Sequence, residues 1–250
     1  MALNEKQLID RLYPRQVRYF TQIGSTNDVA LEWMRQGAAS GSVVVADEQV
    51  QGKGRLGRVW HTPPGTALIV SVILYPSVTN LSQITMLGAL AIYDMVKQLG
   101  ITQVGIKWPN DVMLNGLKVS GILPEALWEN GKLLGVVLGM GINVRIDFSN
   151  TELANKAISI EPALGRRTER IDLLVNLLEH IDSWSDRIGS DILFDTWKSR
   201  LITLGQNVHV NTSDKEVAGL AQTVNSDGAL LIQKSDGQIE RVIAGDIALG

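Results

Sequence analysis

The chain has 250 residues, of which 45% are hydrophobic and 20% charged, and this composition is typical of a soluble globular protein with one sizeable core. Its formal net charge of −3 argues against general nucleic-acid binding, which needs a basic excess, and no apolar run is long enough to span a membrane. Because the chain has no cysteine and no signal-peptide core at its N-terminus, thiolate chemistry and disulfides are excluded and a cytoplasmic protein is expected.

The first polar motif is Ser25-Thr26-Asn27, and apolar residues follow it at helical spacing. Ser25 or Thr26 is therefore predicted to cap a helix that ends near Gly37. Capping alone would explain the motif, but a helix N-terminus also offers free N–H groups to a ligand. The preceding residues 1 to 20 are too few for a helix-turn-helix DNA-binding domain, and Pro14 interrupts any helix begun at Asn4.

A glycine-rich basic loop, Gly52 to Trp60, lies between two apolar segments that are predicted to be strands, residues 43 to 46 and 66 to 74. A Rossmann fingerprint must open a helix after its glycines, and a Walker loop needs Gly-Lys followed by Ser or Thr. The strand-to-strand context and the sequence of this loop exclude both.

The chemistry of this loop suits an anionic ligand. Its glycines allow positive φ angles and a close approach of backbone N–H groups, while Lys53, Arg55 and Arg58 supply donors for phosphate or carboxylate. Trp60 could stack on a base. The same residues would also suit a solvated basic hairpin, so the loop alone does not decide the function.

A second dense motif, Lys107-Trp108-Pro109-Asn110-Asp111, follows an apolar helix predicted from Ser82 to Leu99 and a strand predicted at residues 104 to 107. Proline fixes its own φ and makes the preceding residue extended. The strand is therefore expected to end in a rigid turn that presents Asn110 and Asp111.

The next strands are expected to form hairpins at Asn115-Gly116 and Asn130-Gly131, two sequences that favour type I′ turns. On the strand from Leu117 to Leu123, the alternation places Lys118, Ser120 and Ile122 on one face. Lys118 either contacts a ligand or is an edge charge that prevents aggregation. A strand from residue 133 then runs into Gly139-Met140-Gly141-Ile142-Asn143, where glycines would allow a ligand to approach closely.

The last part of the chain changes in character. Residues 145 to 167 are polar and irregular, and two helices are then predicted, one capped by Thr168 and running through Ile188 and one at residues 191 to 201. From Gly205 the pattern becomes short strands separated by Ser-Asp-Gly turns, which predicts a small β-barrel. We place the domain boundary between residues 1–202 and 203–250.

Taken together, the glycine-rich loop, the Lys-Trp-Pro-Asn-Asp turn, Lys118 to Leu123 and Gly139 to Asn143 resemble the biotin–protein ligases, in order over essentially the whole chain. The resemblance implies an α+β fold, with a central mixed β-sheet flanked by helices, as in class II synthetases, and an SH3-like C-terminal barrel. It also implies two half-reactions. Biotin and ATP with Mg2+ would give biotinyl-5′-AMP, and a lysine of a biotin carboxyl carrier protein would then receive the biotin.

The resemblance assigns roles to particular residues. Lys118 and Arg55 would be catalytic, and biotin would contact Ser25, Thr26, Asn27, Gln49, Lys53, Gly54, Arg55 and Lys118. The nucleotide would contact Arg58, Trp60, Asn110 and Asn143. No metal ligands are assigned, and His61, His180 and His209 lack metal-ligand spacing. Lys53 stands where the family usually has arginine, so a bidentate contact is not expected there.

Two alternatives remain. A lipoate– or octanoate–protein ligase of the same fold family would use Lys118 in the same way, and a non-catalytic ligand-binding module could keep the fold. Neither nucleic acid nor a membrane is expected as a partner. An exposed sheet edge could support a homodimer, as the resemblance suggests, and a repressor role is not expected without a DNA-binding domain.

Overall fold

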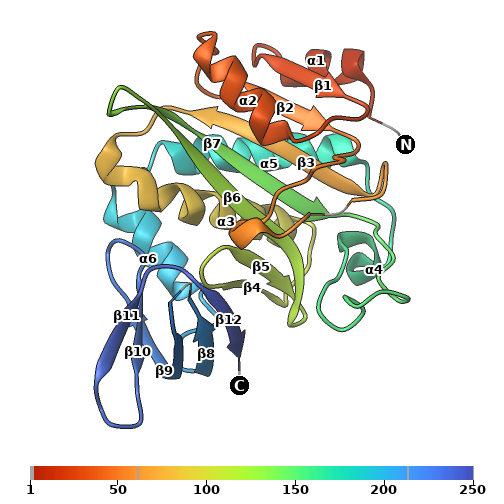
Figure 1. Cartoon of the computed structure of the whole chain (residues 1–250). Helices are drawn as coiled ribbons and strands as arrows, with labels where there is room; N and C mark the ends of the chain where they lie inside the picture. The colour runs from red at the N-terminus through yellow and green to blue at the C-terminus, as the bar shows by residue number, and fades with distance from the viewer. Residues whose placement is uncertain (1–2, 61, 213, 250) are drawn as a thin grey trace.

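The computed structural model describes residues 3–60, 62–212 and 214–249 and contains two β-sheets (Figure 1). The larger sheet has the strand order β1-β2-β3-β7-β6-β5-β4. Only the β1–β2 pair of this sheet is parallel, so the sheet is mixed. Its strands are β1 (Val17–Phe20), β2 (Val43–Ala46), β3 (Ala67–Leu74), β4 (Val104–Lys107), β5 (Asp111–Leu114), β6 (Leu117–Glu129) and β7 (Lys132–Asn143).

Helices cover both faces of this sheet (Figure 1). The α-helices are α1 (Glu5–Leu12), α2 (Thr26–Arg35), α3 (Leu81–Gln98), α4 (Ile160–Leu164), α5 (Arg170–Ser185) and α6 (Asp191–Ser199). Helices α3 and α5 enclose the main core against one face of the sheet. On the other face, α2 packs through Ala30 and Met34 against the strand residues Val44, Ile73 and Val137. Every residue of β3 is buried because this central strand is covered on both sides. The predicted α+β fold with a mixed sheet is confirmed.

Two predicted helix starts are wrong by a short distance. Helix α3 is preceded by Asn80, so Ser82 lies within its first turn. Helix α5 begins after Glu169 and ends at Ser185, before Ile188. Thr168 does not cap it, because the backbone N–H and hydroxyl of Thr168 donate to Glu161 Oε1 instead. The local sequence pattern favours Thr168 as the cap, but its hydrogen bonds to Glu161, which the pattern does not reveal, take the place of the capping contact.

The two Asn-Gly hairpins are confirmed. Asn115 and Gly116 have φ angles of 51° and 78°, and Asn130 and Gly131 have φ angles of 50° and 74°. A type I′ turn needs positive φ at both central positions, and Asn followed by Gly tolerates this at low cost. These turns fix how β5, β6 and β7 pair.

The predicted faces of β6 are wrong because a β-bulge interrupts the alternation. Val112 pairs with Ser120, but the next residue, Met113, pairs with Lys118, so Val119 is the extra residue on β6. Val119 and Ile122 both enter the main core. Lys118 consequently lies on the same side as Gly121, where a Cβ atom would be 3.4 Å from Lys118 Nζ. The bulge turns the lysine away from the core.

The second sheet is antiparallel, with the strand order β11-β10-β9-β8-β12. Its strands are β8 (Asn207–Asn211), β9 (Glu216–Val224), β10 (Leu230–Gln233), β11 (Ile239–Val242) and β12 (Asp246–Leu249). It lies beside β4 and β5 (Figure 1), and Trp108 joins the two sheets. The indole Nε1 of Trp108 donates to Gly228 O at 2.8 Å, and its backbone N–H donates to Thr203 Oγ1 at 2.9 Å. No helix in the described parts of the chain is long and apolar enough to cross a membrane.

Candidate active site

A cavity of about 780 Å³ opens over β6 and β7 and extends to the C-terminal sheet. All twelve residues that the sequence assigns to ligand binding line it, and they come from five separate segments of the chain. They are Ser25, Thr26, Asn27, Gln49, Lys53, Gly54, Arg55, Arg58, Trp60, Asn110, Lys118 and Asn143. Their proximity fits one shared site, and their individual roles stay predictions.

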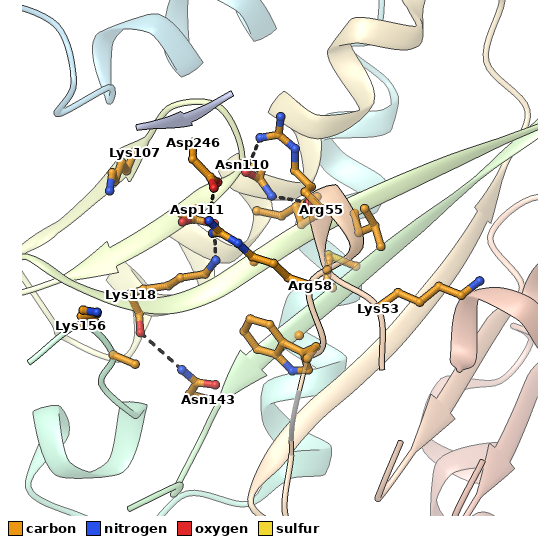
Figure 2. Close-up of a pocket in the computed structure, with 18 of the residues that line it drawn as sticks. Lys53, Arg55, Arg58, Lys107, Asn110, Asp111, Lys118, Asn143, Lys156 and Asp246 are labelled. Carbon is orange, nitrogen blue, oxygen red and sulfur yellow. Dashed lines mark hydrogen bonds and ion pairs between the residues drawn. The ribbon is translucent and has the colours of Figure 1, made fainter. Parts of the chain in front are cut away.

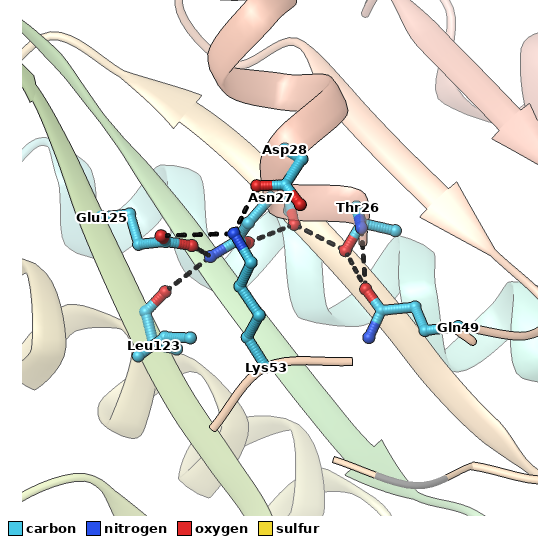
Figure 3. A network of polar contacts seen from close by, with 8 residues as sticks. Thr26, Asn27, Asp28, Gln49, Lys53, Leu123 and Glu125 are labelled. Carbon is cyan, nitrogen blue, oxygen red and sulfur yellow. Dashed lines mark hydrogen bonds and ion pairs between the residues drawn. The ribbon is translucent and has the colours of Figure 1, made fainter. Parts of the chain in front are cut away.

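One end of the cavity, which we call the polar end, is formed by Thr26, Asn27 and Gln49 (Figure 3). Gln49 Oε1 accepts from the backbone N–H of Thr26 at 2.7 Å and lies 2.9 Å from Thr26 Oγ1. Asn27 Nδ2 donates to Leu123 O at 3.2 Å and to Glu125 Oε2 at 2.5 Å. Ser25 is the N-cap residue of α2, as predicted, but its side chain makes no capping hydrogen bond. The buried polar end can therefore form hydrogen bonds with the donors and acceptors of a ligand.

The glycine-rich loop is a small hairpin. Trp60 N donates to Gly52 O at 2.9 Å, and Gly54 N donates to Arg58 O at 2.7 Å. Its tip is a short 3-10 turn, Arg55–Gly57, in which Leu56 has a φ of 55° and Gly57 a φ of 73°. A Cβ atom at Gly52 would lie 2.2 Å from Trp60 O, so the close pairing of the two arms requires glycine there.

Each cation of this hairpin contacts a different part of the protein. Lys53 pairs with Asp28 on α2 and lies 3.8 Å from Glu125 on β6 (Figure 3). Its hydrogen bond to Asp28 raises the pKa of the Lys53 ammonium, and the negative charge of Glu125 adds to this effect against the opposing effect of burial. Lys53 is thus held beside the polar end.

Arg55 and Arg58 point toward the other end of the cavity (Figure 2). Arg55 Nη1 donates to Asn110 Oδ1 at 2.9 Å, and Asn110 Nδ2 donates to Ile122 O at 2.8 Å. Burial lowers the pKa of the Arg55 guanidinium, an effect that the nearby carboxylate of Asp111 opposes. Arg58 forms an ion pair with Asp246 of β12, so the hairpin also contacts the C-terminal sheet.

Trp60 lies on a floor made of backbone. Gly121 and Gly141 are paired across β6 and β7, and a Cβ atom at Gly141 would be 2.5 Å from Cε2 of the indole. The Lys118 ammonium lies 5.6 Å from the centroid of the ring, within the range of a cation–π interaction. Trp60 Nε1 is buried and has no hydrogen-bond partner among the residues that the structure describes, so a ligand acceptor would satisfy it.

Lys118 lines the cavity and forms an ion pair with Asp111, with Nζ and Oδ1 2.7 Å apart (Figure 2). Lys107 also lines the cavity, beside Asp111 across the β4–β5 pair. Burial, reinforced by the charge of Lys118, lowers the pKa of the Lys107 ammonium, and Asp111 opposes both effects. The positive charges of Lys107, Lys118 and Arg55 therefore lie near the carboxylate of Asp111, and this excess of positive charge favours an anionic ligand.

Asn143 supports the strand that carries Lys118. Its Nδ2 donates to Lys118 O at 3.3 Å and to Ile158 O at 3.2 Å. The irregular segment that follows β7 runs beside this point, because Lys118 and Ala157 form a parallel bridge. The segment thereby adds Lys156 and Phe148 to the cavity wall.

Several residues of the site were not assigned from the sequence. Asp111 belongs to the Lys-Trp-Pro-Asn-Asp motif, but the sequence analysis assigned it no ligand contact. Its carboxylate among the cations of the predicted site could have identified it. Lys156 and the C-terminal residues 245–248 carried no local signal, because they reach the cavity only through tertiary contacts. Within the described residues, no group of three or more His, Cys, Asp and Glu side chains could hold a metal ion.

Comparison with known proteins identifies the family. The family model described as "Biotin/lipoate A/B protein ligase family" matches residues 19–143, and the model described as "Biotin protein ligase C terminal domain" matches residues 203–250. The "Bifunctional ligase/repressor BirA" of Bacillus subtilis is 32% identical over 240 residues, which cover 93% of this chain and 73% of that protein. The "Biotin--[acetyl-CoA-carboxylase] ligase" of Mycobacterium tuberculosis is 31% identical and covers 98% of this chain and 95% of that one.

A solved structure agrees. The biotin protein ligase from Aquifex aeolicus in complex with biotin and ATP superposes with a TM-score of 0.80 and 26% identity, covering 94% of this chain and 98% of that one. A mixed sheet of this topology, an antiparallel C-terminal sheet and a cation-lined cavity between them define a ligase of the class that these proteins share. The chain belongs to the biotin/lipoate A/B protein ligase family, in its biotin–protein ligase branch.

Proposed function

We propose that this protein activates biotin with ATP to biotinyl-5′-AMP and transfers the biotin to a lysine of a biotin carboxyl carrier protein or domain. The observation that carries the proposal is the position of Lys118. The bulge in β6 places this lysine in the cavity wall, with its ammonium 2.7 Å from Asp111 and 5.6 Å from the centroid of the Trp60 ring. We assign the part of the cavity around Trp60, Arg58 and Asn110 to the nucleotide and call it the nucleotide end. A carboxylate and an α-phosphate could meet beside Lys118.

In the first half-reaction, an oxygen of the biotin carboxylate attacks the α-phosphorus, and the bond from that phosphorus to the β-phosphate oxygen breaks. Pyrophosphate leaves with the bonding electron pair. Attack brings two anions together, so fixed cations are needed where charge collects. Lys118 would leave its ion pair with Asp111 to bridge the carboxylate and the α-phosphate, and Arg55 would cover the adenylate from the hairpin.

In the second half-reaction, the ε-amine of the carrier lysine attacks the acyl carbon of the mixed anhydride. The amine loses a proton as the amide forms, and AMP leaves with the electrons of the broken carbon–oxygen bond. Hydrolysis competes with this step, so closure of the hairpin over the adenylate would help by excluding water. The glycines at 52, 54 and 57 allow such movement.

The cavity also fits Mg2+ that arrives with the nucleotide. Mg2+ is commonly bound by one or two carboxylates together with substrate phosphates, and Asp111 is a carboxylate of this kind beside Asn110. The ion would neutralise charge on the phosphates. Asp111, which pairs with Lys118 in the absence of the ion, is the residue that would hold it.

The polar end favours biotin over lipoate or octanoate. Thr26, Asn27 and Gln49 are buried polar groups, and an aliphatic chain or a dithiolane would cover them without forming hydrogen bonds. Sites built to hydrogen-bond a substrate strongly reject analogues that lack the matching groups. The cyclic urea of biotin offers both donors and an acceptor.

One assay distinguishes the proposed function from its alternatives. The protein is mixed with MgATP and either biotin, lipoate or octanoate, and pyrophosphate release and the acyl-adenylate are followed, the latter by mass spectrometry. We expect pyrophosphate and biotinyl-5′-AMP with biotin alone. A lipoyl or octanoyl adenylate would support the related ligase, and no adenylate with any acid would support a binding module.

Four further proposals concern the whole protein. The carrier lysine would enter from solvent above the hairpin, where Leu56 and Val59 are exposed. Residues 1–202 and 203–250 would form the catalytic and C-terminal domains. Location in the cytoplasm and a homodimer through a sheet edge remain predictions, and light scattering tests the dimer directly.

A further inference from the structure

Ser71 is a buried hydroxyl in the otherwise apolar strand β3, and it lies behind the cavity wall without lining the cavity. Its Oγ is 2.6 Å from Asn27 Oδ1 and 2.8 Å from Thr26 Oγ1. We infer that Ser71 is a positioning residue that makes Asn27 a pure hydrogen-bond acceptor toward the ligand. This inference rests on the proposed function and adds how the polar end selects its ligand.

Three neighbouring strands together orient the amide of Asn27. Ser71 on β3 is paired with Gly139 on β7, and Gly139 is paired with Leu123 on β6. The Ser71 hydroxyl lies at the amide oxygen, and Leu123 O lies at the amide nitrogen. Between them, a Cβ atom at Gly139 would be 2.2 Å from Asn27 Oδ1. Across the three strands, Ser71 therefore provides a donor, Gly139 leaves space for the amide and Leu123 provides an acceptor. This arrangement fixes the amide of Asn27 in one orientation.

This orientation uses up the donors of Asn27. The amide nitrogen has two hydrogens, and these are directed to Leu123 O and Glu125 Oε2. The amide oxygen has two lone pairs, of which the Ser71 hydroxyl takes one. Only the second lone pair of Oδ1 is left for a ligand, so Asn27 can accept from the ligand but cannot donate to it.

A count of hydroxyl protons points in the same direction. Three close oxygen–oxygen contacts join Gln49 to Thr26, Thr26 to Ser71, and Ser71 to Asn27. Only two hydroxyl protons, one each from Thr26 and Ser71, are available for these three contacts. The polar end thus has an excess of acceptors and favours a ligand that brings N–H donors. Gln49 Nε2 has no hydrogen-bond partner in the described structure and can donate to an oxygen beside those donors. A cyclic urea has this pattern.

The test measures biotin and ATP binding by titration calorimetry for the wild type and Ser71→Ala, with biotin and with an analogue methylated on both ureido nitrogens. We expect Ser71→Ala to raise the Kd for biotin about tenfold, as for loss of a buried hydrogen bond, while the Kd for ATP changes less than about twofold. The methylated analogue should bind the wild type weakly, and Ser71→Ala should weaken it no further, since it brings no N–H donor.

Ser42→Ala is the matched control, because Ser42 is equally buried but lies outside the cavity, with its hydroxyl directed to Gln16. It should leave both Kd values unchanged. If Ser71→Ala does not fold, the near-isosteric Ser71→Cys, a weak donor, replaces it with the same expectation. Equal biotin binding by the wild type and the Ser71 variant would overturn the inference about Ser71 but leave the proposed function intact. A wild type that binds ATP but no biotin would overturn the proposed function, and the inference with it.

Discussion

Lys118 and Arg55 differ in what holds them before a ligand arrives. Lys118 pairs with the carboxylate of Asp111, whereas Arg55 donates to the neutral amide of Asn110. A charged partner must be displaced or neutralised before the cation can serve an anionic substrate. Lys118 is therefore expected to depend on the charge at Asp111, and Arg55 on the position of the hairpin.

Replacement of Lys118 by alanine should remove most adenylate formation. The loss of a charge-assisted contact to the developing phosphate charge is expected to cost about 2 to 4 kcal/mol in the transition state. Pyrophosphate release under single-turnover conditions measures this. Lys132→Ala, which removes an exposed lysine from the neighbouring strand β7, is the control and should be fully active. A folded Lys118→Ala protein with normal pyrophosphate release would refute the role.

Tyr19 predicts a dependence of stability on alkaline pH. Burial, together with the hydrogen bond to Asp47 at 3.0 Å, raises the pKa of Tyr19 to about 12. The unfolded chain loses this proton near pH 10, while the folded protein keeps it. The folded state then binds more protons, so the free energy of unfolding falls as pH rises from about 10 to 12.

Tyr19→Phe should therefore be less stable than the wild type at pH 8, by about 1 kcal/mol for the lost hydrogen bond, and the difference should shrink above pH 10. Urea denaturation of both proteins at several pH values measures it. The exposed Tyr13→Phe serves as control for the substitution itself. A difference that stays constant across the whole pH range would contradict the expectation.

The glycine-rich hairpin is the element that connects these side chains to one another. Its arms are fixed by backbone pairing, and its three cations contact α2, the β4–β5 turn and β12 separately. Surface ion pairs contribute little stability each. The hairpin can therefore exchange these contacts for ligand contacts at small cost.

Arg55→Gly should accelerate the dissociation of biotinyl-5′-AMP and lead to labelling of bystander lysines, if the hairpin acts as a lid. Dissociation of preformed adenylate and single-turnover formation are measured side by side. Arg167→Gly, which removes an exposed arginine from a loop outside the cavity, is the control and should retain the adenylate as the wild type does. If Arg55 acts on the α-phosphate instead, formation slows and dissociation stays unchanged.

At the level of elements, the sequence revealed what local chemistry determines. Asn-Gly turns, the buried strand β3 and the helix after Ser25 were predicted because turn geometry and periodicity act over a few residues. The bulge at Val119 was not predicted, because it depends on the pairing of β6 with β5. Ser71 gave no signal either, since one small polar residue in an apolar strand says nothing about its partners.

At the scale of the whole molecule, the C-terminal sheet is part of the cavity. It is anchored through Trp108, which lies in the turn that also presents Asn110, and its residues 245–248 line the cavity. This contribution was invisible in the sequence because it joins segments more than a hundred residues apart. The two sheets are therefore expected to act together on the nucleotide.

Asp246→Ala should loosen the hairpin without unfolding the protein. The ion pair with Arg58 is largely exposed, so global stability should change by less than about 1 kcal/mol. Hydrogen exchange of residues 52 to 60 should become faster, because this contact tethers the hairpin to β12. Asp236→Ala, in a turn of the same sheet, is the control. Unchanged exchange in the hairpin would show that the tether has no effect.

The floor of the cavity is built from backbone at Gly121, Gly139 and Gly141, and this limits how the protein can evolve new ligand preferences. Any side chain introduced at Gly139 or Gly141 would collide with Asn27 or Trp60 before it met a ligand. Point mutations at these two glycines are therefore not expected to change the ligand preference step by step. Divergence toward other acids would have to proceed through the walls, by exchange of the groups around Thr26 and Gln49, while the glycines stay fixed.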